Sequence, residues 1–284
     1  MPELPEVETI VRDLRDRIIG KKIVQVEVLL KRIVKGKFND FLTVLQYNKI
    51  IQIERRGKLI IFWLADKKHF LLIHLRMTGQ LVYCKKDNII AGGHSDKNQV
   101  ACKPNPHTRV VISFADKSKL LFNDLRTFGY LQIVEIDELE KITGNFGLEA
   151  MEIDFKYLKS FIRTKTASIK TLLLNQNLIA GIGNIYADEA LFLAGIRPVR
   201  PAFSLSDIEI KKLAKSIKQV LQKAIQNRGT TFNNYVDASG NKGEFVKMLN
   251  VYGRKGEECR RCGAIIQKIK VTQRGTSYCG GCQS

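Results

Sequence analysis

The chain has 284 residues, 44% of them hydrophobic, so it is long enough for two modest domains and apolar enough to bury a core. Lysine and arginine total 47 against 28 acidic residues, and the net charge of +19 indicates a polyanionic partner, nucleic acid first and an acidic membrane surface second. The longest apolar runs, such as Leu59–Leu64, are strand-sized, and the acidic opening lacks the cations and apolar stretch of a signal peptide. We therefore expect a cytosolic protein without a membrane span.

The first half of the chain predicts a β-rich domain that begins with a helix. Apolar residues recur at helical spacing over Glu6–Ile19, and Gly20 ends the pattern. Alternating or short apolar runs then predict strands, and residues 86–106, which are polar and contain Gly92-Gly93, predict a flexible loop. The expected strands are Ile23–Leu30, Ile50–Glu54, Leu59–Leu64, Phe70–Leu75, Leu81–Cys84, Arg109–Phe114, Leu120–Phe122 and Tyr130–Val134. Together they indicate a β-sandwich.

The second half predicts helices from about residue 137. The clearest helix spans Ser206–Asn227, where Ser206 and Glu209 form a capping-box pattern. Two shorter helical patterns precede it, and residues 230–247 are polar enough to predict a loop. The shorter helices are Ser168–Leu174 and Ile185–Ala194. We expect an α+β chain with a domain over residues 1–136, a helical domain over 137–250 and a small module over 251–284.

Four of the six cysteines form a metal-binding pattern near the C-terminus. Cys259 and Cys262 make one Cys-x-x-Cys pair, and Cys279 and Cys282 make another. Two such pairs suit tetrahedral Zn²⁺, and a closed four-thiolate site leaves no open position for chemistry. We predict one structural zinc, with a basic hairpin between the two pairs whose Arg274 contacts phosphate. The remaining two cysteines, Cys84 and Cys102, are expected to have no special role.

The N-terminus offers an unusual nucleophile. Removal of Met1 would expose the secondary amine of Pro2, and an α-amine titrates at about 7.7–8.0, well below lysine. Attack of this amine on the anomeric carbon of a sugar yields an iminium ion, and Glu3 could protonate the sugar oxygen as the ring opens. The simpler interpretation is that Pro2 does nothing and that the nearby acids only complement a helix dipole.

Several segments resemble the formamidopyrimidine-DNA glycosylase family, from residue 2 to residue 283. They are PELPEVET at 2–9, ERRGKLI at 54–60, HLRMTG at 74–79, DLRTFG at 124–129, AGIGNIYADEALFLAGI at 180–196 and QRGTSYC at 273–279. The resemblance implies an N-terminal β-sandwich domain with the first helix, and a helix-two-turn-helix domain followed by a zinc finger. It also implies a bifunctional enzyme of base excision repair that binds damaged double-stranded DNA.

The resemblance assigns the catalytic roles. Pro2 would form the imine with the damaged nucleotide, Glu3 would be the general acid and Glu6 would support them. Lys58 would act at the phosphates and in β-elimination, and Arg274 would clamp phosphates and assist δ-elimination. Asn184 would bind phosphate, which also fits its place at a helix N-terminus.

The resemblance also assigns DNA contacts. The damaged base must leave the stack, and Met77, Arg126 and Phe128 would fill the resulting hole. Without the family, Met77 and Phe128 would be ordinary core residues. The further expected contacts, mostly with phosphate, are His107, Lys165 and Lys170. We assign no base-reading residue within the loop 230–247.

Other functions remain open at this point. The opening Glu-Leu-Pro-Glu-Val and the pair Arg126 and Phe128 resemble the branch of the family that excises oxidised purines, namely 8-oxoguanine and formamidopyrimidines, more than endonuclease VIII, which acts on pyrimidine lesions. A non-catalytic DNA-binding paralogue would not need Pro2, Glu3 and Lys58 together with Arg274. An RNA-binding or ribosomal zinc-ribbon protein would explain the charge and the cysteines but not the N-terminus. We expect a monomer.

Overall fold

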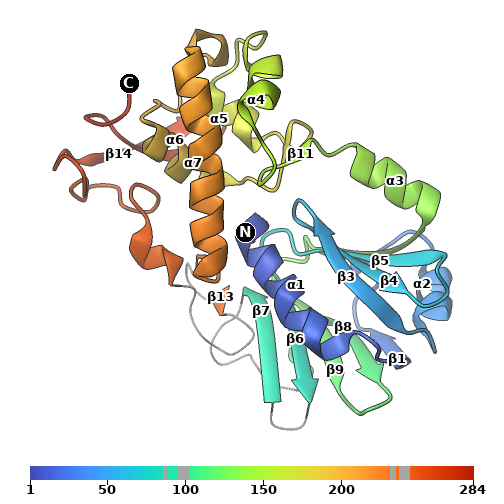
Figure 1. Cartoon of the computed structure of the whole chain (residues 1–284). Coiled ribbons are helices and arrows are strands. Elements are labelled where there is room, and N and C mark those ends of the chain that lie inside the picture. The colour runs from blue at the N-terminus through green and yellow to red at the C-terminus, as the bar shows by residue number, and fades with distance from the viewer. Residues whose placement is uncertain (86–87, 95–102, 231–234, 237–243) are drawn as a thin grey trace. The chain divides into compact units, whose positions relative to one another are not determined.

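A computed structural model gives the structure of the chain, and it describes residues 1–85, 88–94, 103–230, 235–236 and 244–284. The chain forms two compact units (Figure 1). The first contains residues 1–144 and 227–244, and the second contains residues 145–226 and 245–284. This division differs from the expected boundaries, because a short segment returns to the first unit after the long helix.

Two sheets form the first unit. The six-stranded sheet has the order β1 (Ile23–Val28), β8 (Thr108–Phe114), β9 (Lys119–Asp124), β6 (Gly79–Lys85), β7 (Asn88–His94) and β13 (Tyr235–Val236). The five-stranded sheet has the order β2 (Val34–Lys35), β10 (Tyr130–Glu135), β5 (His69–His74), β4 (Leu59–Leu64) and β3 (Ile50–Arg56). Neighbouring strands are antiparallel except for β10 and β2. A shared apolar core contains Leu81 and Tyr83 of one sheet and Phe62 and Ile73 of the other, which confirms the predicted sandwich.

Four further elements complete the first unit: α1 (Leu4–Ile18), a 3₁₀ turn (Lys31–Ile33), α2 (Phe38–Leu45) and α3 (Ile136–Gly144). Helix α1 packs on β3, β4 and β7, and buries its apolar stripe in the sandwich core. The expected flexible loop over 86–106 is wrong in part, because residues 88–94 form β7 and pair with both β6 and β13. Cys84 is buried on β6, whereas Cys102 lies outside the described residues.

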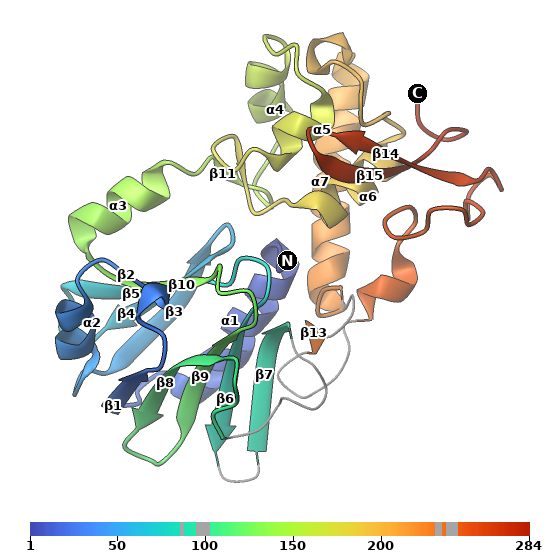
Figure 2. The ribbon, with the colours of Figure 1, turned by 180° about the vertical axis from the view of Figure 1, so that it is seen from behind.

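The second unit is helical and carries the cysteine hairpin, which is the antiparallel pair of β14 (Ile266–Val271) and β15 (Arg274–Cys279) between the two Cys-x-x-Cys pairs (Figure 2). Its helices are α4 (Phe155–Ile162), α5 (Ile169–Leu174), α6 (Asn184–Ala194) and α7 (Asp207–Gln226), with 3₁₀ turns at Ala202–Ser204 and Phe245–Met248. Its other strands are β11 (Leu148–Glu149) and β12 (Ile179–Ala180). β15 packs against α6, and α6 packs against α7.

The predicted capping box of α7 is confirmed. The backbone N–H of Ser206 donates to Glu209 Oε2 at 2.7 Å, and the N–H of Glu209 donates to Ser206 Oγ at 3.3 Å. These bonds satisfy amides that have no partner inside the helix, so the helix begins where the sequence signal placed it. Among the described residues, no helix is long and apolar enough to cross a membrane.

Candidate active site

The start of α1 is held by its own acidic residues. Pro2 is buried, and the Glu3 side chain is only 2% exposed. The Glu3 side chain accepts a bond from the Glu6 backbone, and the Glu3 N–H donates to Glu6 Oε2 at 2.8 Å. This reciprocal capping box fixes the backbone directly after Pro2. The amine that Met1 removal would expose therefore belongs to an ordered helix start.

Glu6 also ties the helix start to the segment that returns after α7. Its Oε1 accepts from the Thr230 N–H at 2.8 Å and from Thr230 Oγ1 at 3.1 Å. Gly229 beside it has φ of +79°, and a Cβ there would lie 2.6 Å from Glu6 Oε1. Only glycine suits both the left-handed backbone and the close carboxylate. Glu6 thus has a structural connection that the sequence did not reveal.

Lys58 lies in a tight turn between β3 and β4. Arg56 pairs with Leu59, and Gly57 between them has φ of +56°. The Arg55 side chain anchors this hairpin to α1, because its Nε lies 2.7 Å from Glu8 Oε2. Burial would raise the pKa of Glu8, but Arg55 and Arg12 together hold that pKa below its ordinary value. The carboxylate therefore stays charged and keeps the β3–β4 hairpin on the helix.

His74, which the sequence analysis quoted within HLRMTG but did not assign, lies close enough to Lys58 for the lysine's charge to affect its pKa. Desolvation by its surroundings, together with Arg76, Lys58 and Lys35, lowers the pKa of His74 to about 3. The neutral ring accepts a bond at Nδ1 from the Arg76 N–H at 3.0 Å. Lys35 Nζ lies 3.6 Å from the centre of the Tyr130 ring, which itself lies 5.7 Å from the His74 ring. Three cations thus surround a neutral imidazole, an arrangement that favours an anionic ligand.

Met77, Arg126 and Phe128 lie on two neighbouring turns. Met77 is 37% exposed and Phe128 is 53% exposed, so the alternative interpretation of these residues as core is wrong. The Arg126 N–H donates to Thr78 Oγ1 at 3.0 Å, which joins the two turns. The Arg126 guanidinium stacks 4.8 Å from the Phe128 ring centre. The structure therefore places Arg126 and Phe128 in contact, with Met77 next to the threonine that joins their turn to its own, and all three are exposed.

His107 is half-buried, and its carbonyl accepts from the Asp124 N–H at 2.9 Å. Asp124 Oδ2 also accepts from the Gly129 N–H at 2.7 Å. One buried aspartate thus connects the His107 segment with the turn that carries Phe128.

The expected basic contacts of the second unit differ from one another. Lys165 is exposed, as a phosphate contact must be. Lys170 is 0% exposed, and its Nζ lies 2.5 Å from Asp188 Oδ1. The expectation that Lys170 contacts phosphate is wrong, because a fully buried and paired ammonium has no surface to offer. A lysine near a helix N-terminus has the same sequence pattern whether its side chain turns outward or inward.

Asn184 bonds to the residue that follows Arg274 in the hairpin of β14 and β15. Asn184 is the first residue of α6, and its Nδ2 donates to the Gly275 carbonyl at 2.8 Å. Arg274 is exposed at the start of β15. Both belong to the second unit, whereas Pro2, Glu3 and Lys58 belong to the first.

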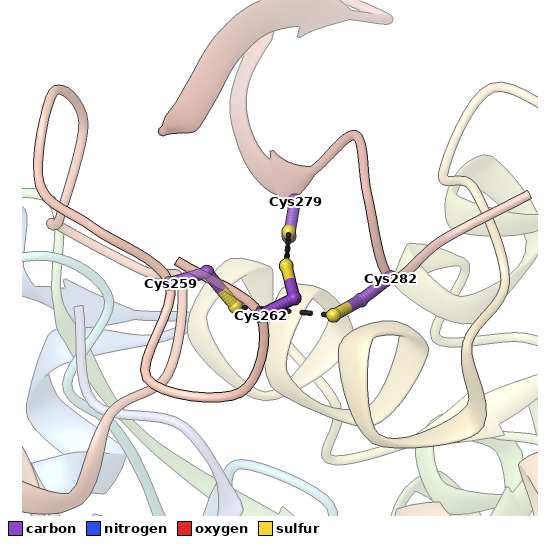
Figure 3. Close-up of side chains that lie close together, drawn as sticks. All are labelled: Cys259, Cys262, Cys279 and Cys282. Atoms are coloured by element: carbon purple, nitrogen blue, oxygen red, sulfur yellow. Dashed lines mark hydrogen bonds between the residues drawn. The ribbon is translucent and has the colours of Figure 1, made fainter. Parts of the chain in front are cut away.

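The four cysteines form a metal centre (Figure 3). Their sulfurs all lie within 4.8 Å of one another, with 3.9 Å between Cys259 and Cys282 and 3.4 Å between Cys262 and Cys279. Zn–S bonds of about 2.3 Å in a tetrahedron separate sulfurs by about 3.8 Å. The donor set therefore fits one structural zinc, in agreement with the prediction.

Family models match three stretches of the chain. They are described as the formamidopyrimidine-DNA glycosylase N-terminal domain over residues 1–131, the H2TH domain of the same enzymes over 146–235 and a zinc finger found in FPG and IleRS over 256–284. The matches span both compact units and the cysteine hairpin.

Relatives match over the whole length. The formamidopyrimidine-DNA glycosylase of Pelotomaculum thermopropionicum is 41% identical, covering 100% of this chain and 99% of that protein. A mutant of Lactococcus lactis FPG in complex with DNA containing Fapy-dG is 37% identical, with a TM-score of 0.89 and 100% of both chains covered. The wild-type Lactococcus lactis protein in complex with DNA containing an oxidised pyrimidine is also 37% identical, with a TM-score of 0.88 and the same coverage. The chain therefore belongs to the formamidopyrimidine-DNA glycosylase family, whose members are DNA glycosylases of base excision repair with AP lyase activity.

Proposed function

We propose that this protein excises oxidised purines, namely 8-oxoguanine and formamidopyrimidines, from double-stranded DNA and then nicks the strand by β,δ-elimination. The observation that carries the proposal is the buried start of α1, where the reciprocal capping box of Glu3 and Glu6 fixes the backbone directly after Pro2. The chain that carries this helix start matches the family over its whole length. The Lactococcus lactis protein binds both Fapy-dG DNA and DNA with an oxidised pyrimidine, so the purine assignment is supported chiefly by the opening Glu-Leu-Pro-Glu-Val and by the pair Arg126 and Phe128.

The chemistry follows from the residues. The unprotonated amine of Pro2 attacks the anomeric carbon, the damaged base leaves, and the ring opens as Glu3 protonates the sugar oxygen. The resulting iminium withdraws electrons, so the C2′ proton is lost and the C3′–O bond breaks. In a second elimination the C4′ proton of the conjugated imine is lost and the C5′–O bond breaks, and water then releases the sugar fragment from Pro2. Lys58 acts at the phosphates and in the first elimination, and Arg274 assists the second.

The DNA contacts are proposed from the exposure of the side chains, from the resemblance to the family for His107 and, for Asn184, from its place at the N-terminus of α6. Arg126 would pair with the base left behind, while Met77 and Phe128 occupy the vacated space, because all three are exposed on two turns that are bonded to each other. Asn184, Lys165 and His107 would contact the backbone. Glu6 would keep the helix start in place. Lys170 is left out of the proposed DNA contacts, because its side chain is buried and paired with Asp188.

We also propose that the protein is a cytosolic monomer. A net charge of +19 opposes self-association, and a four-thiolate zinc site suits a reducing compartment. Sedimentation at micromolar concentration should give a mass near 32.3 kDa.

The test is borohydride trapping on duplexes that carry either 8-oxoguanine or an oxidised pyrimidine, with mass mapping of the adduct. We expect an adduct at Pro2 that forms faster on the purine lesion, and we expect Pro2→Gly to lose most trapping while retaining DNA binding. Faster trapping on the pyrimidine lesion would replace the purine assignment with an endonuclease VIII-like one. Tight binding without any adduct would favour a non-catalytic paralogue.

A further inference from the structure

The hairpin turn before Arg274 has a strained backbone. Val271 pairs with Arg274, and the two residues between them, Thr272 and Gln273, have φ of +44° and +60°. A turn of this kind favours Asn-Gly, and a β-branched threonine rarely adopts positive φ. Such a conformation persists only where the surrounding structure holds it. The support must therefore come from the residues packed against the hairpin.

Three side chains from α5 and α6 hold the residues that follow Arg274. Lys170 Nζ donates to Thr276 Oγ1 at 2.8 Å and to the Gly275 carbonyl at 3.3 Å. Asn184 Nδ2 donates to the same carbonyl at 2.8 Å. Asp188 Oδ2 accepts from the Ser277 N–H at 2.8 Å. The backbone of residues 275–277 is thus fixed from the residue directly after Arg274 onward.

Lys170 and Asp188 are connected to each other as well. Both side chains are 0% exposed, and Nζ lies 2.5 Å from Oδ1. Burial raises the pKa of Asp188 to about 7, although Lys170 and the Ser277 N–H oppose this shift and Glu189 adds to it. A buried ion pair contributes little more stability than a well-packed apolar pair of the same volume, but it dictates the direction of every hydrogen bond that it makes. This pair directs its bonds to one short stretch of backbone.

We propose that Lys170 and Asp188 are positioning residues, which hold the hairpin so that the Arg274 guanidinium is presented in one place for the second elimination. The proposal rests on the function proposed above for Arg274. It assigns to Lys170 an indirect role, through the Gly275 carbonyl and Thr276, in place of the phosphate contact that the sequence suggested.

The test is a double-mutant cycle on a duplex with a preformed abasic site, which bypasses base excision. The variants are Lys170→Met, Arg274→Ala and the combination, and the measurement is the single-turnover rate of δ-elimination. Displacing a catalytic group by about 1 Å can lower the reaction rate about 100-fold, so we expect Lys170→Met to slow δ-elimination at least about tenfold. In the Arg274→Ala background, Lys170→Met should lower the rate of δ-elimination by less than about twofold. Borohydride trapping at Pro2 should stay within about twofold, because imine formation does not use the hairpin.

Controls keep the result interpretable. Lys159→Met removes another Lys–Asp pair of the second unit, with Nζ 2.7 Å from Asp207 Oδ2, and should leave δ-elimination unchanged. Lys170→Arg should restore part of the rate, since it returns the charge and donors. If Lys170→Met fails to retain zinc, Asp188→Asn replaces it in the cycle, because the amide keeps the shape and loses the charge.

The outcomes separate the two claims. Equal effects of Lys170→Met in both backgrounds, or none in either while Arg274→Ala is slow, would overturn the positioning role. A normal δ-elimination rate for Arg274→Ala itself would instead overturn the function proposed for Arg274, and the positioning role with it. Slow elimination by Lys170→Met alone, with trapping and zinc content preserved, supports the proposal.

Discussion

The two compact units hold their functional groups by different physical means. In the first, α1 and the β3–β4 turn rest on one apolar core between two sheets. In the second, the hairpin with Arg274 depends on a buried ion pair, a set of directed hydrogen bonds and a four-cysteine metal centre. An apolar core tolerates repacking, whereas polar networks and metal sites fail when one member is removed. The second unit should therefore be the more sensitive of the two to the loss of a single side chain or of the metal.

Loss of zinc should give the largest effect and should be confined to the second unit. Cys279→Ser, or chelation, removes a ligand of a site whose metal-coupled folding is worth roughly 10–16 kcal/mol in isolated zinc-finger peptides. We expect zinc content to fall and DNA affinity to drop at least about 100-fold, because the hairpin loses its fixed ends. Calorimetry should still show the cooperative transition of the first unit. Full affinity after chelation would contradict the structural role of the metal.

A cavity in the sandwich should have the second-largest effect. Phe62 on β4 is fully buried, and Phe62→Ala should lower the free energy of unfolding of the first unit by about 3–5 kcal/mol. Ile51→Ala on the neighbouring strand, where the side chain is exposed, should cost less than about 1 kcal/mol. Denaturant melts with zinc release as a second signal would check both. Early zinc release by Phe62→Ala would show that the units do not fail separately.

A glycine comparison isolates the connection between Glu6 and residues 229–230. Gly229 and Gly36 have similar φ, +79° and +83°, but only an added Cβ at Gly229 would meet a neighbour. Gly36→Ala should cost about 1 kcal/mol from backbone strain alone, and Gly229→Ala should cost about 1–3 kcal/mol more. Gly229→Ala should also slow borohydride trapping at Pro2, because the added Cβ displaces the Glu6 side chain. Equal melting temperatures for the two variants would contradict the close approach.

The last expected effect is a pair of opposite pH responses, whose size per pH unit is small. The pKa of His74 is lowered from 6.5 to about 3, so its contribution to stability is complete above pH 6.5 and is lost as pH falls toward 3. The pKa of Asp188 is raised from 3.8 to about 7, so its contribution falls as pH rises between those values. Each slope is at most about 1.4 kcal/mol per pH unit. His74→Gln and Asp188→Asn should change the pH dependence of stability, relative to the unmodified protein, in opposite directions between pH 4.5 and 6.5.

The same contrast explains how much the sequence could predict. Alternating apolar residues predicted the strands of the sandwich, and Ser206 with Glu209 predicted the start of α7, because burial and capping act locally. β7 was missed because Gly92 and Gly93 suggest a loop, although a strand pairs through backbone groups. For the second unit, the spacing of the cysteines predicted the zinc centre. Lys170 was misassigned, because the direction of a polar side chain depends on Asp188 and Thr276, which are distant in sequence.

The return of residues 227–244 to the first unit has a consequence for biosynthesis. Thr230 and Glu6 are bonded across a separation of 224 residues, and β13 completes the edge of the six-stranded sheet from the same late segment. The helices α4 to α7 must therefore leave the ribosome before the first unit can acquire its last strand and before Glu6 gains its partner. Contacts of such long range are slow to form, because closing so large a loop costs chain entropy. The helix start that carries Pro2 should be among the last parts of the nascent protein to reach its final structure.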